Sequence, residues 1–443
     1  MSKNLKTLFI CGFVAIFFLF LPASNLSNLT VLAEQNSRNW NMFRGDPSHS
    51  GVATGAFVPS PNLIWAFPNH SFPTNSPDHG FAFFCSPAIV DGVVYTGSWN
   101  PYIYAINASD GNQIWSYNTG WYIQSSPAVA YGMVYVANAH AGFYALNSTT
   151  GEKVWGKILS QNYNYGAYSS PTVVNGVVYI GCSSGDIFAY DAFSGIQLWD
   201  AKLDGAVESS PAVVNGAVYV GSFGSLTLPY VSGRFYALDA ADGTILWSDN
   251  FTQPISSSPT FDNGIVYVGC RDSLVYALNA DTGNQIWNYT TYGEVNSSPA
   301  MQNGILYVIS QDSSLYALNA SSGNIIWSRN IGQTTSNSVI IGGAILSTSN
   351  DGIIYSFNAT NGYNIWNYSL NSTGLFSDAV VVNGTIYINS QSGIYALGAK
   401  PLPISTPTQT PTVPEFPILA IPMLLIVMAS AGLVVYFKSR KFM

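Results

Sequence analysis

Short apolar runs separated by polar turns recur about every forty residues along most of the chain. In the unit from 257 to 287 the runs are four to six residues long and rich in β-branched and aromatic side chains, which is typical of strands. Asn263-Gly264 separates the first two runs and supplies the positive φ angles that a two-residue hairpin needs. Each unit therefore predicts four antiparallel strands. Equivalent pairs occur at Asp91-Gly92, Asn175-Gly176, Asn215-Gly216, Asn303-Gly304 and Asn383-Gly384.

A fixed spacing of a small residue, glycine and tryptophan ends each unit. Gly283 follows Ala277 by six residues, and Trp287 follows by four more. The spacing recurs at Ala105-Gly111-Trp115, Ala145-Gly151-Trp155, Ala189-Gly195-Trp199, Ala237-Gly243-Trp247, Ala317-Gly323-Trp327 and Ser356-Gly362-Trp366. It closely resembles the tryptophan-docking motif of the PQQ-like (pyrroloquinoline-quinone-type) propeller family. The resemblance implies that each indole packs between the small residue of its own motif and the backbone near the next glycine. The tryptophans are then structural.

The number of units predicts the architecture. Strands open eight times, near Ser86, Ser126, Ser170, Ser210, Ser258, Ser298, Ser338 and Ser377. The eighth unit ends at 395–397 without a tryptophan, whereas Trp65 has no strands of its own before it. We therefore expect an all-β, eight-bladed propeller over residues 38–400, with the segment around Trp65 as the outer strand of the last blade. Seven blades is the alternative. Residues 40–46 and 49–51 also resemble the lead-in of this family.

The two ends of the chain predict export and a membrane anchor. Residues 1–33 read as a signal peptide, with an uncleaved N-terminal anchor as the alternative. Residues 401–417 are a Pro/Thr-rich linker, and 418–437 form an uncharged stretch long enough to span a bilayer. The basic tail 438–443 predicts a cytoplasmic C-terminus and an extracytoplasmic propeller. Residues 414–417 resemble the PEF-type sorting tails of archaeal surface proteins, which implies replacement of the span by a lipid.

Charge and cysteine content exclude several classes of partner. Charged residues make up 8% of the chain, and its net charge is −8. The few basic side chains of the repeat region are scattered, so a nucleic-acid partner is excluded. Cys85, Cys182 and Cys270 have no CxxC spacing, and we expect them to be small core residues. Several Asn-x-Ser/Thr sequons are candidate glycan acceptors in an exported protein.

The family resemblance also raises the possibility of catalysis. It implies, for quinoprotein dehydrogenases, an adjacent Cys pair, a carboxylate base and a calcium ion held by Glu, Asn and Asp. The sequence has no adjacent Cys pair, and its histidines lack metal-ligand spacing. Glu208 and Glu294 each precede a Ser-Ser-Pro strand opening and are the candidates to face a cofactor. We therefore expect no cofactor, with PQQ and calcium as the alternative.

Aromatic residues concentrate in the loops that break the repeat length. Rings beside Asn and Gln are typical of surfaces that stack on sugars or peptides, although loop aromatics can also cap a core. The sequence therefore predicts a monomeric, non-catalytic binding or scaffold propeller on the cell surface, with a protein or glycan partner. The alternatives are a quinoprotein oxidoreductase and an envelope scaffold like the barrel-assembly lipoprotein. The candidate binding residues are Trp99, Tyr102, Trp121, Tyr122, Tyr163, Tyr165, Tyr168, Tyr230 and Arg234.

Overall fold

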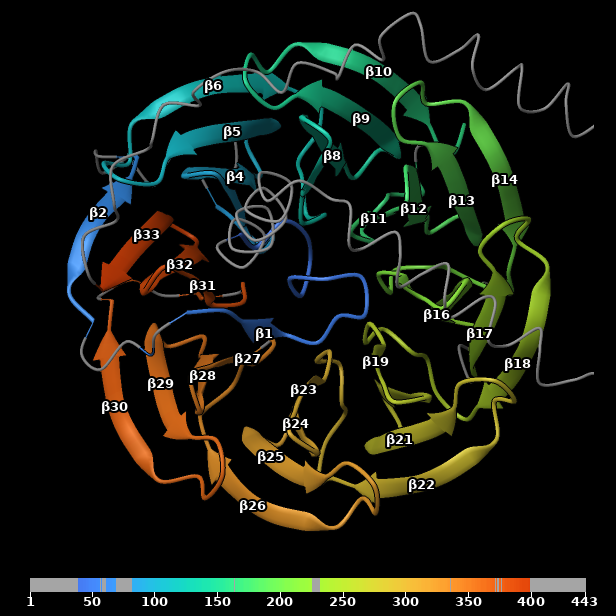
Figure 1. The fold of residues 1–443 in the computed structure, drawn as a ribbon, viewed down its shortest axis with the longest axis vertical. Coiled ribbons are helices and arrows are strands. Elements are labelled where there is room, and N and C mark those ends of the chain that lie inside the picture. The colour runs from blue at the N-terminus through green and yellow to red at the C-terminus, as the bar shows by residue number, and fades with distance from the viewer. Residues whose placement is uncertain are drawn as a thin grey trace, which may run out of the picture. The chain divides into compact units, whose positions relative to one another are not determined.

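Eight sheets, antiparallel except for the pairing of β1 (Val52–Ala53) with β27 (Val339–Ile341), form a closed ring in the computed structural model (Figure 1). The structure describes residues 39–55, 57, 61–68, 82–162, 164–224, 232–334, 336–370, 372, 374–375 and 377–398. Each blade has a short inner strand at the central channel and a long outer strand on the rim (Figure 1). These residues confirm the all-β, eight-bladed propeller.

The first four blades follow the repeat units in order. Their strands are β3 (Ala88–Val90), β4 (Val93–Gly97), β5 (Tyr102–Asn107) and β6 (Gln113–Asn118) in blade 1; β7 (Ala128–Ala130), β8 (Met133–Ala137), β9 (Gly142–Asn147) and β10 (Lys153–Ile158) in blade 2; β11 (Thr172–Val174), β12 (Val177–Gly181), β13 (Asp186–Asp191) and β14 (Gln197–Lys202) in blade 3; and β15 (Ala212–Val214), β16 (Ala217–Ser222), β17 (Gly233–Asp239) and β18 (Ile245–Phe251) in blade 4.

The other four blades include two that borrow a strand from the N-terminal region. Their strands are β19 (Thr260–Asp262), β20 (Ile265–Gly269), β21 (Leu274–Asn279) and β22 (Gln285–Thr290) in blade 5; β23 (Ala300–Gln302), β24 (Ile305–Ser310), β25 (Ser314–Asn319) and β26 (Ile325–Asn330) in blade 6; β27 (Val339–Ile341), β28 (Ala344–Thr348), β29 (Ile353–Asn358) and β30 (Asn364–Ser369), with β1 (Val52–Ala53) added, in blade 7; and β31 (Val380–Val382), β32 (Thr385–Ser390), β33 (Gly393–Gly398) and β2 (Leu63–Phe67) in blade 8.

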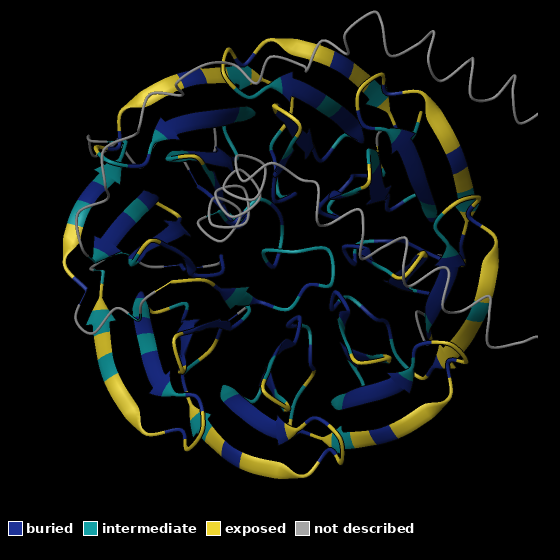
Figure 2. Ribbon diagram, viewed as in Figure 1, coloured by how far each residue is buried: buried dark blue, intermediate teal, exposed yellow. Residues whose placement is uncertain are grey.

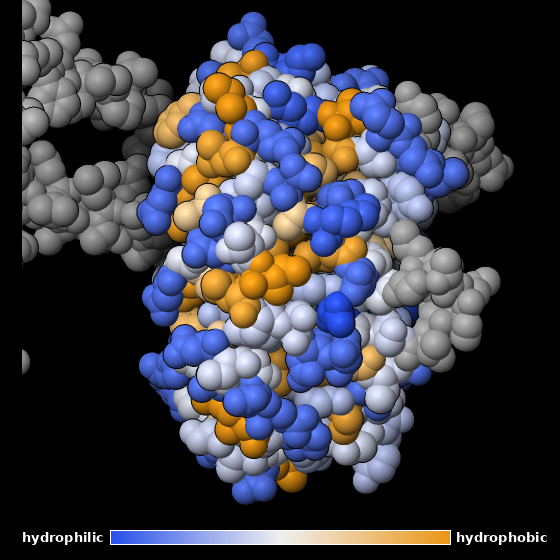
Figure 3. Space-filling view, turned by 90° about the vertical axis from the view of Figure 1, so that its right-hand side faces the viewer, coloured by the Kyte–Doolittle hydropathy of each residue, from blue (hydrophilic) through white to orange (hydrophobic). Residues whose placement is uncertain are grey.

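Ring closure follows the prediction. Strand β2 pairs with β33, and Trp65 lies opposite Ala396, so the small residue and the tryptophan of this motif come from the two ends of the repeat region. The Asn-Gly turns also form as expected; Asn263 and Gly264 have φ angles of 48° and 77°. On the outer strands the tryptophan faces inward and its neighbours face solvent, which gives alternating bands in Figure 2. On the rim their aliphatic side chains lie among polar ones (Figure 3).

The tryptophans join each blade to the next. The Trp287 Nε1–H donates to the Ala320 carbonyl at 2.8 Å, and its ring lies 2.7 Å from where a Cβ on Gly323 would stand. A flat ring fits at this distance only because glycine has no side chain. The same arrangement occurs in seven joints, made by Trp65, Trp115, Trp155, Trp199, Trp247, Trp287 and Trp327. Trp366 is half-buried opposite Ser356, and the residue four positions before Trp65, where the other motifs have their docking glycine, is Pro61.

A tyrosine on the second strand of each of seven blades supports the same contact. The Tyr267 hydroxyl donates to the Ala320 carbonyl at 3.2 Å, so this oxygen accepts hydrogen bonds from both Trp287 and Tyr267. Blade 7 has Leu346 at the position of the tyrosine. The repeat spacing alone does not indicate this second donor. The same pairing is made by Tyr95, Tyr135, Tyr179, Tyr219, Tyr307 and Tyr387.

A belt of hydrogen bonds links the starts of the inner strands around the channel. The Ser86 N–H donates to Ser126 Oγ, and this contact repeats at 2.9–3.0 Å from blade to blade as far as Ser298. Asn337 and Asp378 then complete the ring, because Asp378 N–H donates to Ser86 Oγ. The belt corrects one detail of the sequence reading: the equivalents of Ser86 in blades 7 and 8 are Asn337 and Asp378, one residue from the predicted Ser338 and Ser377.

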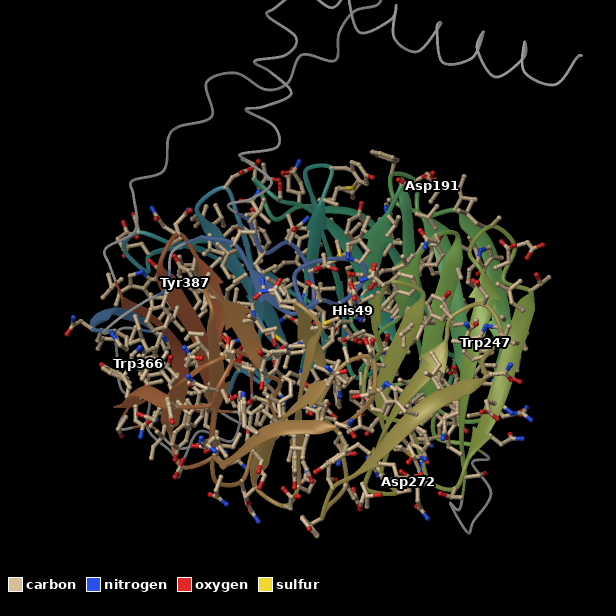
Figure 4. The ribbon with its side chains drawn as sticks, turned by 60° about the horizontal axis from the view of Figure 1, so that its bottom comes forward. His49, Asp191, Trp247, Asp272, Trp366 and Tyr387 are labelled. Atoms are coloured by element: carbon tan, nitrogen blue, oxygen red, sulfur yellow. The ribbon has the colours of Figure 1, made fainter. Side chains whose placement is uncertain are left out.

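The N-terminal lead-in, residues 39–53, lies in the channel next to the belt (Figure 1). Its backbone bonds to the second residue of the inner strands in six blades, at Ile89, Val129, Val213, Phe261, Met301 and Ile340. His49, in the centre of Figure 4, is buried between the carbonyl of Pro259 and the hydroxyl of Thr172. Burial lowers the pKa of His49 to about 4, so this imidazole is neutral near pH 7.

A buried arginine of the lead-in joins three blades. Arg44 donates to the carbonyls of Ser338 and Pro299 at 2.6 and 2.8 Å and lies 3.8 Å from the Asp378 carboxylate. Burial raises the pKa of Asp378, although Arg44 opposes this shift. The pair is therefore a desolvated charge pair at the last two blades.

None of the described residues forms a helix that is long and apolar enough to cross a membrane. The predicted signal peptide, linker, span and tail lie outside the described residues. The described cysteines, Cys85, Cys182 and Cys270, are buried free thiols, as expected of core residues.

The docking contact predicts a position-specific cost of adding one methyl group. Gly323 and Gly304 have φ angles of 72° and 75°, but a Cβ at 304 meets nothing within 4 Å. Gly304→Ala is expected to lose about 1–2 kcal/mol for its left-handed backbone. Gly323→Ala is expected to lose about 1–3 kcal/mol more, because the methyl group displaces Trp287. Equal losses in denaturant titrations would show that the docking contact does not limit stability.

The Arg44–Asp378 pair predicts a loss that a second substitution reverses. Arg44→Leu leaves the Asp378 carboxylate buried and uncompensated, which costs about 3–5 kcal/mol of unfolding free energy. Asp378→Ser supplies the belt residue used by the other blades, so the double variant is expected to regain most of that loss. Urea titration of both variants and of Asp378→Ser alone measures the coupling. Additive losses would contradict the pairing.

Candidate binding site at the channel mouth

The strand order gives the propeller two different faces. Turns between the second and third strands, and the connections between blades, lie on one face; the other turns lie on the opposite face. Asp272 belongs to the first kind of turn and Asp191 to the second, and Figure 4 shows them at opposite ends of the molecule. We call the first face the connection face. The belt lies toward this face, and the lead-in lies one layer deeper, so together they form the floor of the channel mouth.

The residues two positions before the belt serines of blades 1 to 6 form a ring at the mouth. Its members have the same position in six blades and all are half-buried, yet they differ from blade to blade. The belt beneath them is almost constant. Variation at fixed positions beside a constant floor is the arrangement expected where a fold carries a binding specificity. We call these residues the mouth ring: Phe84, Gln124, Tyr168, Glu208, Ser256 and Asn296.

Aromatic side chains line the first three blades of this mouth. The ring centroids of Phe84 and Trp99 are 4.3 Å apart, and those of Trp99 and Tyr122 are 5.3 Å apart. Burial, and to a smaller extent the neighbouring Tyr122, raise the pKa of Tyr168. We call Phe84, Trp99, Tyr122 and Tyr168 the aromatic arc. Trp121, which is 42% exposed, extends the arc outward and stacks on His140 at 3.7 Å.

The other predicted loop residues lie elsewhere. Tyr165 is half-buried and packs against the core of blades 2 and 3. Tyr102 lies on β5 beside Tyr104, at 6.0 Å between ring centroids, and packs against the core of blades 1 and 8. Arg234 lies on β17 and pairs with Asp204. Tyr163 and Tyr230 lie outside the described residues. The structure thus brings Trp99, Trp121, Tyr122 and Tyr168 together and places Tyr102 and Arg234 away from them.

An arginine and a carboxylate follow the arc around the mouth. Glu208 accepts a hydrogen bond from Ser183 at 3.5 Å, and the Arg271 guanidinium stacks over the Phe223 ring at 4.7 Å. Burial raises the pKa of Glu208, while Arg271 and the hydrogen bond from Ser183 oppose the shift. No sequence motif points to Arg271, because the turn that holds it is not close to Glu208 in the chain.

Glu294 does not occupy the same position as Glu208. Glu208 lies two residues before its belt serine, at the mouth-ring position. Glu294 lies two residues before the mouth-ring position of its own blade, which Asn296 occupies. Glu294 is exposed and accepts a hydrogen bond from Asn296 at 3.2 Å. The two carboxylates lie in equivalent loops, as expected. Their side chains do not occupy equivalent positions within those loops.

A polar pocket opens beside Arg271 in blades 5 to 7. Its volume is about 220 Å³, and Ser256 and Asn296 of the mouth ring are among its lining residues. Ser256 Oγ donates to Asn296 Oδ1 at 2.8 Å, which fixes the amide orientation. The remaining lining residues are Ser297, Ile309, Ser310, Gln311, Thr334 and Ser336. The mouth is therefore aromatic on one side and polar on the other.

A family model described as outer membrane protein assembly factor BamB matches residues 60–225 and 231–401. These two stretches include most of the chain and every strand of the eight blades except β1. The chain belongs to this family of PQQ-like propellers. No curated protein matches the sequence.

The solved structures of similar fold include proteins with different named functions. BamB from Moraxella catarrhalis is 16% identical with a TM-score of 0.61, over 76% of this chain and 99% of that one. A europium-containing methanol dehydrogenase is 12% identical with a TM-score of 0.70, over 84% and 100%. Quinohemoprotein alcohol dehydrogenase from Comamonas testosteroni is 14% identical with a TM-score of 0.67, over 83% and 82%. At these identities the likeness shows the fold alone.

The quinoprotein neighbours make it necessary to ask whether this mouth fits PQQ and calcium. Calcium takes about six to eight oxygen ligands, commonly including carboxylates. Within the described part of this PQQ-like propeller, no three His, Cys, Asp or Glu side chains are grouped to hold a metal ion. Glu208 is the one carboxylate among the six mouth-ring residues. This donor set does not fit a calcium-bound quinone.

The environment of Glu208 predicts a pH-dependent stability difference. A carboxyl whose folded pKa is raised favours the protonated folded state, so its contribution to stability is present at low pH and is lost as pH rises through that pKa. Glu208→Gln mimics the protonated form and is therefore expected to be more stable than wild type at pH 7 but not at pH 3. Denaturant titrations across this range measure the difference. Glu294→Gln, at an exposed carboxylate, is the matched control and is expected to show no such trend.

Proposed function

We propose that this protein is a membrane-anchored, non-catalytic binding module that holds glycan chains at the connection face of its propeller. The observation that carries the proposal is the aromatic arc in the variable mouth ring. Sugar rings present apolar C–H faces that stack on aromatic rings, and their hydroxyls pair with amides and hydroxyls. The arc supplies the first kind of surface, and the pocket beside Arg271 supplies the second.

The shape of the mouth supports an elongated ligand. Aromatic and polar groups follow one another around the mouth over successive blades, from Phe84 in blade 1 to Thr334 before blade 7. The belt and lead-in form the floor, so a ligand lies across the mouth and does not thread the channel. A chain of several sugar units matches these features.

The predicted anchor would hold the propeller at the cell membrane. An exported propeller followed by a Pro/Thr-rich linker and a membrane span would stand on the outer face of the cell membrane as a monomer. Retention by the span or by a lipid in its place would both keep the mouth accessible to glycans of the cell envelope or its surroundings.

Two other functions follow from the names of the relatives. The dehydrogenase neighbours suggest oxidation of an alcohol or sugar, and the family description suggests an assembly factor for envelope proteins. The mouth-ring residues favour binding over oxidation, because they lack the ligands for a calcium-bound quinone. The aromatic arc favours a glycan over a protein partner, because the same mouth offers rings that stack on sugars and a polar pocket that bonds to their hydroxyls.

The proposal predicts saturable glycan binding that depends on the arc. Full-length protein in detergent is screened on a glycan array, and positive ligands are titrated by calorimetry. Trp99→Ala and Trp121→Ala are each expected to weaken binding about tenfold, because truncating an aromatic anchor costs about 1–2 kcal/mol. Tyr363→Ala, a 69% exposed ring on the opposite face, is the control and is expected to leave affinity unchanged.

Two outcomes would contradict this function. Absence of binding to any glycan, with all variants folded by thermal melting, would remove the glycan as the ligand. Saturable binding of PQQ with calcium in the same calorimeter, together with dye-linked oxidation, would make the protein an oxidoreductase.

A further inference from the structure

We propose that the pocket beside Arg271 recognises the carboxylate of an acidic sugar unit, so that the ligand is an acidic glycan such as a polyuronate. This inference rests on the proposed function and specifies the class of glycan. Three observations support it. Arg271 lacks a neutralising partner, most other cations of the described propeller are paired, and the pocket lining contains no acidic residue.

Arg271 is held in place but is not neutralised. Its guanidinium stacks on Phe223, and its Nε is buried without a hydrogen-bond partner among the described residues. No carboxylate of the described chain lies within 4.0 Å of it, and Glu208 acts on it only from farther away. A fixed guanidinium with free donors is suited to bidentate recognition of a carboxylate.

Most other basic side chains of the described propeller are already paired. Lys202 pairs with Asp186, and Arg234 pairs with Asp204. Arg329 donates to the carbonyls of Gly362 and Asn361. Lys153 and Lys157 lie on the outer strand β10, away from the mouth. Arg271 is thus the cation that the fold leaves available at the connection face.

The pocket supplies neutral hydrogen-bonding groups around this charge. Gln311 is exposed, and its amide makes no side-chain hydrogen bond within the described chain. The hydroxyls of Thr334 and Ser310 also line the pocket, but they are buried and bond to Ser336 and to the Gly293 carbonyl. None of the lining residues is acidic. A pocket of about 220 Å³ is smaller than the roughly 300–1,000 Å³ typical of drug-sized ligands, so it suits one sugar unit of a longer chain. A carboxylate on that unit would pair with Arg271, and its hydroxyls with the amides and hydroxyls.

The negative net charge of the chain limits the attraction of acidic ligands to direct contact with Arg271. The chain carries a net charge of −8, so long-range attraction does not collect anions. Specificity for an acidic sugar then depends on direct contact with Arg271. Such a contact weakens in salt, because the pocket is open to solvent.

The test compares two ligands that differ only in charge. A galacturonate oligomer and its methyl ester are titrated by calorimetry into full-length protein in detergent. The acid is expected to bind at least about tenfold more tightly, since hydrogen bonds to charged groups are the stronger ones. Arg271→Gln is expected to abolish this preference, so that the variant binds the acid and the ester with equal affinity. Arg329→Gln, at a cation paired with carbonyls, is the control and is expected to keep the preference.

The outcomes separate this inference from the proposed function. Equal affinities of wild type for acid and ester would overturn the role of Arg271 and leave glycan binding intact. Binding of neither ligand, together with a negative glycan array, would overturn the proposed function itself. Arg271→Lys guards against a misfolded Gln variant: it keeps the charge and is expected to retain part of the preference, and an unchanged preference in a folded Gln variant would also overturn the inference.

Discussion

The joint between neighbouring blades is the contact on which this propeller depends. A blade alone leaves both faces apolar, so its stability comes from the next blade. At each of seven joints a tryptophan and a tyrosine donate to a single carbonyl of the following blade, as Trp287 and Tyr267 do at Ala320. Both lone pairs of that oxygen are used, which fixes the angle between blades. Because the same angle is repeated around the ring, the geometry of one joint decides how many blades close it.

The joint between blades 7 and 8 differs from the other seven, and the N-terminal lead-in adds contacts at this point. Blade 7 has Leu346 at the tyrosine position, and the belt there passes through Asn337 and Asp378 instead of serine. Arg44 reaches the carbonyls before blades 6 and 7 and the Asp378 carboxylate before blade 8. The buried charge therefore lies where the repeat departs from its pattern. The N-terminal segment closes the ring twice, with β2 on the rim and with Arg44 at the axis.

Features confined to one repeat could be predicted from the sequence, and features shared between repeats could not. The Asn-Gly turns and the Ala-Gly-Trp spacing are local, so their period revealed strands, blades and closure through Trp65. The second donor from tyrosine, the belt and the path of Arg44 each pair residues of different blades, and no spacing records those pairs. For the site, the aromatic loops were visible as Trp99, Trp121, Tyr122 and Tyr168. Aligning the repeats on Ser-Ser-Pro would also have revealed Gln124, Ser256 and Asn296 beside Glu208, and would have shown Glu294 out of position. Arg271 over Phe223 joins turns of two blades, and only the fold brings them together.

The same construction explains how one fold can carry unrelated activities. The belt residue must be a small hydrogen-bonding side chain, because its oxygen accepts the N–H of the preceding blade. The residue two positions earlier is not required to accept this hydrogen bond, and it faces the mouth. Each of the first six blades therefore contributes one position without this constraint, and these six positions form a ring whose side chains can change without altering the joints. In this chain, the described positions run from the aromatic ring of Phe84 and the phenol of Tyr168 to the carboxyl of Glu208 and the amide of Asn296. The described part of the mouth therefore changes from apolar to polar around a closed floor.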